Sequence, residues 1–263
     1  MEQSNVNSYL LATVTKALEI LEPFDSNRDD LSMTQIAEAI NLPKSSVFRY
    51  LATLERYNYL ERDSETERYH LGMKLLQLGA IVTRRHQLRS VALPVMAQLR
   101  ETFGETVNLV IPRRDKVIYL EVLESPSAIK MSAQIGQEDF AHASALGKAM
   151  LSLLSPAQLD TMEKWPLIRC TDNTITEWPA LLLELEEVRR RGFAIDERES
   201  NMEVRCVGAA IQDYRSQVAA ISISGPENRL TRVLALEIGP ELMKATNHVS
   251  ALLGHKQGHQ QNT

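Results

Sequence analysis

The stretch LPKSSVFRYLATL, residues 42–54, combines hydroxyl and basic side chains with the periodicity of an amphipathic helix. Val47, Leu51 and Leu54 recur at the spacing of a buried helix face. The opposite face, near the start of the helix, carries Lys44, Ser45, Ser46 and Arg49. Arginine can form two hydrogen bonds with a guanine edge, serine tolerates several bases, and lysine neutralises phosphate. The pattern predicts a helix that contacts DNA, with Tyr50 either on the DNA backbone or in the core.

The preceding residues predict the partner helix of a helix-turn-helix. Ser32 and Gln35 have the spacing of a capping box, which would start a short helix. Pro43 suits the first position of the second helix, where a missing N–H costs nothing. A further helix is expected over residues 14–24, so the unit would contain three helices.

A predicted hairpin adds a wing to this unit. Residues 59–62 and 68–71 are short strand-like runs on either side of a polar turn. The hairpin would bring Arg62 and Arg68 beside the DNA backbone. Nine basic residues face five acidic ones between residues 44 and 89, so the local charge favours phosphate although the whole chain carries −5.

Length and composition suit an ordinary two-domain protein. The chain has 263 residues, of which 24% are charged and 44% apolar. A run of about 18 apolar residues would indicate a membrane span, and the sequence has none. The first residues also lack the pattern of an export signal. Because Cys170 and Cys206 have no metal-ligand spacing, we expect a cytoplasmic, reduced protein without metal or organic cofactor.

The second half of the chain predicts a linker followed by strands and helices. Residues 73–90 have a helical pattern with mostly basic polar positions, typical of a linker helix that pairs with a second copy. Pro94 is expected to begin a helix that ends at Phe103. The runs that favour β-structure are residues 106–111, 117–123, 129–135, 193–198, 206–212 and 218–224. Helices are expected over residues 144–154, 156–164, 179–191 and 231–253, which gives an α+β domain.

Five segments, in this order and spacing, resemble those of the IclR family of bacterial transcription regulators. They are LPKSSVFRYLATL, HASALGKAML, GFAIDERE, VRCVGAAIQD and AAISISGP. The resemblance covers nearly the full chain. It implies an N-terminal winged helix-turn-helix, a linker helix and a C-terminal GAF-like effector domain with an antiparallel sheet. Members of the family bind operators as dimers or tetramers and respond to small organic acids or related metabolites.

On this basis the chain divides into four parts. We expect a DNA-binding domain over residues 1–72, a linker helix over 73–90, an effector-binding domain over 91–254 and a flexible tail over 255–263. The implied function is that of a repressor that binds a double-stranded DNA operator as a homodimer or homotetramer. It would respond to a small polar metabolite, an organic acid or a related carbonyl compound.

The resemblance also carries over an effector site. Its residues are Met131, Ala145, Leu146, Asp196, Cys206, Ser222 and Ser224. Independently of the family, Ser222 and Ser224 alternate with apolar neighbours, so both hydroxyls share one face of a strand. Polar anchors among apolar side chains are typical of a small-molecule pocket. The alternatives are an ordinary exposed strand face for the serines and a buried structural thiol for Cys206.

Two other functions remain open at this level. An enzyme, a hydrolase or transferase, would use Cys206 as nucleophile with His142 and Asp196, although no nucleophile signature surrounds Cys206. A second alternative is a helix-turn-helix that only mediates protein contacts, which the acid-free stretch 68–100 argues against. Gly147-Lys148 lacks both the preceding glycine and the following hydroxyl of a phosphate-binding loop.

Two residues depart from the family pattern. Glu203 stands where glycine is common, and Ala210 replaces a common proline. A carboxylate at the mouth of the pocket would disfavour an anionic effector unless it points to solvent.

Overall fold

The computed structural model describes residues 10–25, 28–85 and 87–255. The chain separates into two compact units, residues 1–85 and 86–263, each with its own core. The predicted flexible tail, residues 255–263, lies outside the described residues except for His255.

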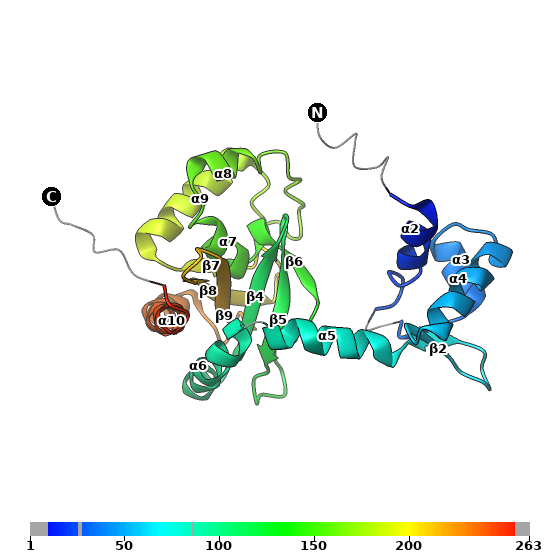
Figure 1. Cartoon of the computed structure of the whole chain (residues 1–263). Helices are drawn as coiled ribbons and strands as arrows, with labels where there is room; N and C mark the ends of the chain where they lie inside the picture. Colours follow the sequence, from blue (N-terminus) through cyan, green and yellow to red (C-terminus); the bar gives the residue numbers. More distant parts are fainter. Residues whose placement is uncertain (1–9, 26–27, 86, 256–263) are drawn as a thin grey trace. The chain divides into compact units, whose positions relative to one another are not determined.

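The first unit is a helix-turn-helix with a hairpin, as the sequence predicts (Figure 1). Its three strands form a sheet in the order β1-β3-β2. Its elements are α2 (Ala12–Glu19), β1 (Asp30–Leu31), α3 (Met33–Ala39), α4 (Lys44–Arg56), β2 (Leu60–Arg62), β3 (Tyr69–Leu71) and α5 (Met73–Arg85). Strand β1 is not expected from the sequence, because two residues are too short to show a periodicity.

Local signals set the bounds of α3 and α4. The Ser32 hydroxyl accepts from the Gln35 N–H, and the Gln35 side chain accepts from the Ser32 N–H, so the capping box is confirmed. Asn41 takes a left-handed conformation, φ 51°, in the turn between the helices. Pro43 is the N-cap of α4, one position earlier than predicted. The predicted helix 14–24 ends at Glu19, although the residues beyond it still contribute to the core.

The second unit is built on one antiparallel sheet with the strand order β6-β5-β4-β9-β8-β7. Its strands are β4 (Thr106–Arg113), β5 (Lys116–Leu123), β6 (Glu138–Phe140), β7 (Ala194–Asp196), β8 (Val204–Gln212) and β9 (Val218–Pro226). Its helices are α6 (Gln87–Phe103), the 3-10 helix η2 (Ala141–Ala143), α7 (Ala145–Leu151), α8 (Pro156–Asp160), α9 (Trp178–Arg191) and α10 (Arg232–Leu252). The predicted α+β class with an antiparallel sheet is confirmed.

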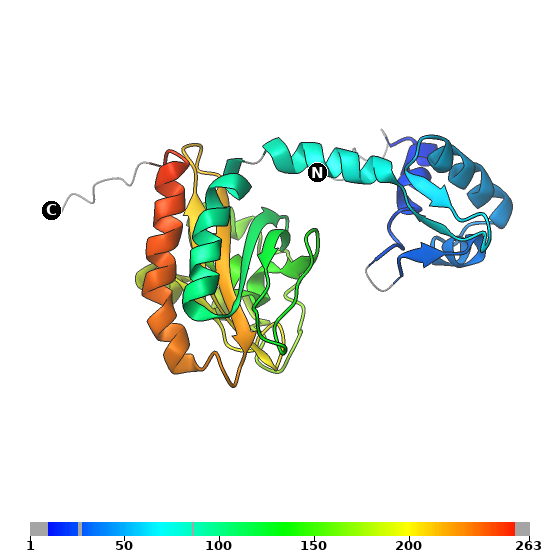
Figure 2. The same ribbon diagram turned by 90° about the horizontal axis from the view of Figure 1, so that it is seen from below.

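Helices cover both faces of this sheet. On one face α6 and α10 lie side by side and enclose an apolar core with the strands (Figure 2). On the other face α7 crosses β7, β8 and β9, and α9 packs beyond it. Gly208 of β8 allows this crossing, because a Cβ there would lie 2.7 Å from the carbonyl carbon of Ala145. The second face carries most of the predicted effector residues.

One predicted strand is wrong, and the bounds of two predicted helices differ from the structure. Residues 129–135 do not form a strand, and β6 forms instead over Glu138–Phe140. The apolar residues of the predicted run do not pack on one face, since Ile129 is 74% exposed and Ile135 58%. The predicted linker helix 73–90 ends at Arg85, and Pro94 lies inside α6. Burial of α6 side chains on both sides of Pro94 compensates for the one backbone hydrogen bond that a proline removes.

Candidate DNA interface and effector site

The exposed face of α4 is set by its buried face. Val47, Leu51 and Leu54 pack into the core of the first unit. Lys44, Ser45 and Arg49 are exposed in consequence, and Ser46 is half-buried. The three exposed side chains lie near the N-terminal end of α4, and contact of all four residues with DNA stays a prediction.

Two aromatic side chains of α4 behave differently. Tyr50 is half-buried and packs against the core, which favours the second of its two interpretations. Phe48 is exposed, and sequence reasoning missed it as a surface residue of this helix. The available signal was its position outside the buried stripe. An exposed phenylalanine beside Arg49 adds an apolar surface of the kind that contacts thymine methyl groups.

The two wing arginines have unequal partners. Arg62 pairs with Glu67 across the hairpin at 2.7 Å, and both side chains are exposed. Arg68 donates from Nε to Oδ2 of Asp30 at 2.6 Å and from a terminal nitrogen to Oε1 of Gln35 at 3.2 Å. Arg68, which directly precedes β3, thus joins the hairpin to β1 and to the capping box of α3. Contact of either arginine with DNA stays a prediction. Arg68 also stabilises the first unit through its hydrogen bonds to Asp30 and Gln35.

The predicted serine pair of the effector site lies on the α7 face of the second sheet. Ser222 and Ser224 are both buried, with their hydroxyl oxygens 3.2 Å apart. Cys206 is opposite Ser224 in the β8–β9 pair. The exposed-strand alternative for the serines is therefore wrong.

Asn108 completes this cluster and was missed from the sequence. It lies opposite Ser222 on β4. Its amide nitrogen donates to the Ser222 hydroxyl at 3.2 Å and to the Ser224 hydroxyl at 3.1 Å. Only the strand order, which places β4 beside β9, brings it there. An asparagine in a strand of apolar residues was the one available signal.

The carboxylate of Asp196 accepts hydrogen bonds from the turn that follows it in the chain. It accepts from the backbone N–H groups of Glu199 and Ser200 and from the Ser200 hydroxyl. Burial raises the pKa of Asp196, and these hydrogen bonds act in the opposite direction. Asp196 is the strand neighbour of Cys206, so it lies beside the serine cluster. Its contact with an effector stays a prediction.

The apolar members of the predicted site belong to two clusters on the same face. Leu146 and Met131 pack with the cluster around Val110 and Tyr119. Ala145 packs with Cys206 in a smaller one. The structure therefore brings the predicted residues to one sheet face, while contact of these three with a ligand stays a prediction.

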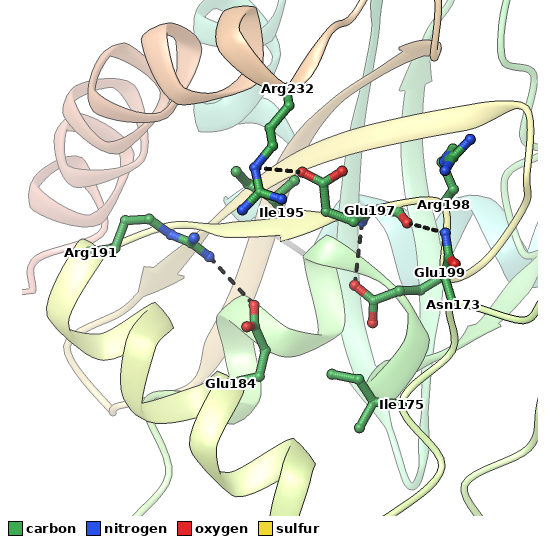
Figure 3. A pocket seen from close by; sticks show the side chains of 9 residues that line it. All are labelled: Asn173, Ile175, Glu184, Arg191, Ile195, Glu197, Arg198, Glu199 and Arg232. Atoms are coloured by element: carbon green, nitrogen blue, oxygen red, sulfur yellow. Dashed lines mark hydrogen bonds and ion pairs between the residues drawn. The ribbon is translucent and has the colours of Figure 1, made fainter.

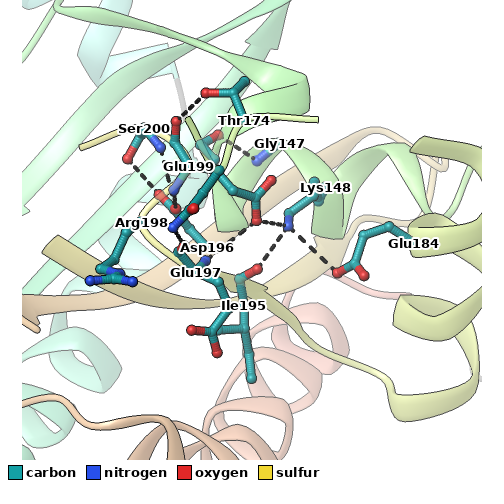
Figure 4. A network of polar contacts seen from close by, with 12 residues as sticks. Gly147, Lys148, Thr174, Glu184, Ile195, Asp196, Glu197, Arg198, Glu199 and Ser200 are labelled. Atoms are coloured by element: carbon teal, nitrogen blue, oxygen red, sulfur yellow. Dashed lines mark hydrogen bonds and ion pairs between the residues drawn. The ribbon is translucent and has the colours of Figure 1, made fainter. Parts of the chain in front are cut away.

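Lys148 of α7 is a buried charged residue. The sequence assigns it no role, because Gly147-Lys148 does not belong to a phosphate-binding loop. Its side chain is 1% exposed. The ammonium group forms a close ion pair with Glu199, donates to the Ile195 carbonyl at 2.8 Å and lies 3.5 Å from Glu184 (Figure 4). Burial raises the pKa of Glu199 to about 7, although Lys148 acts against this. Lys148 thus holds α7 to α9 and to the turn that begins at Asp196.

A cavity of about 510 Å³ adjoins this network and is lined by charged side chains (Figure 3). Its charges are largely paired. Glu184 lies 3.5 Å from Arg191, and Glu197 lies 3.1 Å from Arg205 and 3.6 Å from Arg232. The predicted effector residues are not among its lining residues, which are Asn173, Ile175, Glu184, Arg191, Ile195, Glu197, Arg198, Glu199 and Arg232.

The geometry does not favour the enzyme alternative. Burial raises the pKa of the Cys206 thiol well above its usual range, so Cys206 stays protonated and is not a nucleophile. His142 instead lies with Nε2 3.0 Å from the Ile168 carbonyl. Within the described ranges, no group of three or more acidic, histidine and cysteine side chains has the arrangement of a metal site.

The two departures from the family pattern lie on the surface or in the sheet. Glu203 is exposed to solvent. Ala210 pairs with Ala220 in the β8–β9 ladder. Neither residue places a carboxylate among the buried serines.

A winged helix-turn-helix followed by an α+β unit defines a DNA-binding transcriptional regulator. Residues 13–64 match the IclR helix-turn-helix domain, and residues 80–251 match the domain described as bacterial transcriptional regulator IclR C-terminal. The chain belongs to the IclR family of bacterial transcriptional regulators. This membership also argues against the enzyme and against a helix-turn-helix that binds only protein.

Individual relatives agree with this assignment. The transcriptional repressor AllR of Escherichia coli (strain K12) is 32% identical over 243 residues, which cover 92% of this chain and 90% of AllR. The transcriptional regulator BhcR of Paracoccus denitrificans (strain Pd 1222) is 33% identical, with coverages of 91% and 86%. The crystal structure of IclR from Thermotoga maritima is 32% identical, has a TM-score of 0.76, and covers 92% of this chain and 99% of that one. None of the helices that the structure describes has the length and hydropathy to cross a membrane.

Proposed function

We propose that the protein is a repressor that binds its operator through α4 and releases it when a small organic acid binds the second unit. The observation that carries DNA contact is the exposed face of Lys44, Ser45 and Arg49 at the start of α4. The N-terminal end of a recognition helix is the part that reaches base edges in the major groove. The cytoplasm is the compartment where such an operator is found.

The effector part of the proposal is supported by the polar cluster on the α7 face. Ser222, Ser224 and Asn108 are buried among apolar side chains, which is the composition of a selective small-molecule site. Met131, Ala145, Leu146, Asp196 and Cys206 surround it as the proposed remaining contacts.

A homo-oligomer is part of the proposal. Helix α5 leaves Met73, Leu76 and Ile81 more than half exposed, so an apolar surface is available to a second copy. Paired recognition helices would read half-sites about one DNA turn apart. An effector that favours one arrangement of the pair would change their spacing and therefore operator affinity.

The recognition-helix assignment is tested by exchanging one arginine. The operator sequence is first selected from random DNA with the wild type. Arg49→Ala should then weaken operator binding by roughly 10- to 100-fold and relax the preference at one base pair, as expected for loss of a base contact. Arg56→Ala is the matched control, because Arg56 is exposed at the far end of the same helix. Equal effects of the two changes would contradict the assignment.

The effector response is tested with a panel of carboxylates, aldehydes, sugar acids and aromatic acids. A compound that binds only the folded state at 100 times its Kd adds about 2.7 kcal/mol of stability, which a thermal-shift assay detects. Ser224→Ala combined with Cys206→Ala should leave operator binding intact and weaken the response. An unaltered response would exclude this site.

A further inference from the structure

A buried carboxylate oxygen without a partner borders the cavity of about 510 Å³ beside α9. Glu199 is 5% exposed and lines this cavity. Its Oε1 pairs with Lys148 and accepts from the N–H of Glu197 at 3.3 Å. Its Oε2 is buried and has no hydrogen-bond partner within the described residues. Because an unpaired buried acceptor loses its hydration without compensation, it indicates a donor that the chain itself does not supply.

Hydrogen bonds between two segments hold this cavity in shape. One segment, residues 161–177, contains no helix or strand, and the other is the turn that follows β7. Asn173 donates to the Glu197 carbonyl at 3.0 Å. Thr174 donates to the Glu199 carbonyl at 2.7 Å. A preformed space of this size is within the range of small-molecule sites.

Two arginines lie across this space from Glu199. Figure 3 shows Arg191 and Arg232 on one side of it and the Glu199 carboxylate on the other. Both arginines form only loose ion pairs, at 3.5 Å from Glu184 and 3.6 Å from Glu197. The cavity thus offers guanidinium groups, which bind carboxylates well, opposite an unpaired carboxylate oxygen.

The side chains around the cavity leave an excess of positive charge. Three arginines and three glutamates line the cavity, and their charges balance. Lys148 and Arg205, which pair with two of these glutamates, add two further cations. With Asp196 ionised in the same turn, one positive charge remains in excess. Electrostatic complementarity therefore favours a ligand that carries more negative than positive charge.

We propose that this cavity is a second ligand site, which takes an acidic amino acid. The ammonium group of the ligand donates to Oε2 of Glu199, and its two carboxylates bind Arg191 and Arg232. One cation and two anions in the ligand match both the unpaired oxygen and the excess of positive charge. The site is additional to the proposed response to an organic acid, because the cavity shares no lining residue with the serine cluster.

Isothermal titration calorimetry of the full chain at pH 8 tests the ligand class. L-Aspartate and L-glutamate are compared with succinate and glutarate, which have the same carboxylates and no amino group. At least one amino acid should bind about tenfold more tightly than its dicarboxylate, the effect of one charge-assisted hydrogen bond. L-Alanine, which lacks the second carboxylate, should bind about tenfold more weakly than that amino acid. No binding of either acidic amino acid, or equal binding of the amino acid and its dicarboxylate, would overturn the inference.

Two variants locate the ligand. Arg232→Gln should weaken binding of the amino acid by roughly tenfold, and it should fold because the Arg232 side chain is 70% exposed. Arg215→Gln, the same change at an exposed position outside the cavity, is the matched control. Glu199→Gln should remove the preference for the amino acid over the dicarboxylate, because an amide that turns its oxygen to Lys148 presents N–H groups to the ammonium. Operator binding of each variant checks its fold, and Arg232→Gln decides the outcome if Glu199→Gln does not fold.

The pH dependence of binding gives an independent readout. Glu199 faces Lys148 of α7 and Asp196 at the end of β7, and Glu184 of α9 lies 3.5 Å from the same Lys148 ammonium. Burial raises the pKa of Glu199 to about 7. Between pH 6 and pH 8 Glu199 ionises, so the affinity for the amino acid should rise by roughly tenfold while that for the dicarboxylate falls. Parallel pH profiles for the two ligands would contradict the contact with Glu199.

A last comparison separates this cavity from the serine cluster. Loss of amino-acid binding in Ser224→Ala/Cys206→Ala, together with its retention in Arg232→Gln, would place the ligand among the serines and overturn the inference. A wild type that binds the amino acid in the cavity while its operator binding responds to no organic acid would instead count against the proposed function alone.

Discussion

Lys148→Met should destabilise the second unit strongly, and more so at high pH. The substitution keeps the buried stem of Lys148 and removes the charge that faces Glu199. Leaving one partner of a buried ion pair without the other costs roughly 3–5 kcal/mol. In the wild type the folded-state pKa of Glu199 is about 7, above its ordinary 4.5. Ionisation of this group therefore lowers the free energy of unfolding as the pH rises from about 4.5 to about 7. Above pH 7 it adds no further pH dependence.

Without Lys148, the pKa of Glu199 rises further because burial is no longer opposed. The folded variant must then keep Glu199 protonated above pH 7, and its free energy of unfolding falls by about 1.4 kcal/mol per pH unit. Between pH 7 and pH 8.5 the variant should therefore lose about 2 kcal/mol that the wild type keeps.

Urea unfolding followed by tryptophan fluorescence measures this loss. The signal reports on the second unit, because Trp165 and Trp178, the two tryptophans of the chain, both belong to it. The double variant Lys148→Met/Glu199→Gln is the control. It has no unpaired charge at this pair and should recover to within about 1 kcal/mol of the wild type, with no extra pH slope. Parallel pH profiles for the wild type and the single variant, or no recovery in the double variant, would refute the reasoning.

Two further substitutions test positions that organise the units. Gly147→Ala should abolish or severely reduce folding of the second unit, since its Cβ would lie 2.1 Å from the Ala141 carbonyl oxygen. A thermal midpoint equal to that of the wild type would contradict this contact. Arg68→Ala should lower the thermal midpoint of the first unit more than Arg62→Ala. The reason is that Arg68 joins the hairpin to Asp30 and Gln35, whereas Arg62 pairs with the exposed Glu67. The reverse order in circular dichroism melts would exclude the structural role of Arg68.

The parts of the fold that sequence predicts well are those with local signals. The capping box at Ser32, the buried stripe of α4 and the hairpin after it all depend on residues within a few positions of each other. Ser222 and Ser224 are similar, because alternation alone places them on one face. Pro94 misleads for a physical reason, since packing against the sheet outweighs a local helix breaker.

The remaining parts depend on distant pairings. Asn108 meets Ser222 only because β4 pairs with β9, which is more than a hundred residues away. Lys148 meets Glu199 only because α7 crosses the end of β7. A lysine in an apolar helix is a visible anomaly, but its partner is not visible in the sequence. The charged partner and the pKa of about 7 follow from tertiary packing alone.

The hydrogen bonds of Arg68 have a consequence for how the signal is transmitted. Oε1 of Gln35 accepts hydrogen bonds from both the Ser32 N–H and the Arg68 side chain. Helix α3 and the hairpin of the DNA-binding unit are therefore joined at the same atom. A DNA-binding unit joined in this way has few internal degrees of freedom. Effector binding should leave the affinity of one DNA-binding unit for a single half-site unchanged. It should change only the simultaneous binding of two such units to the two half-sites of an operator. Operators with one half-site deleted should then lose the metabolite response before they lose binding.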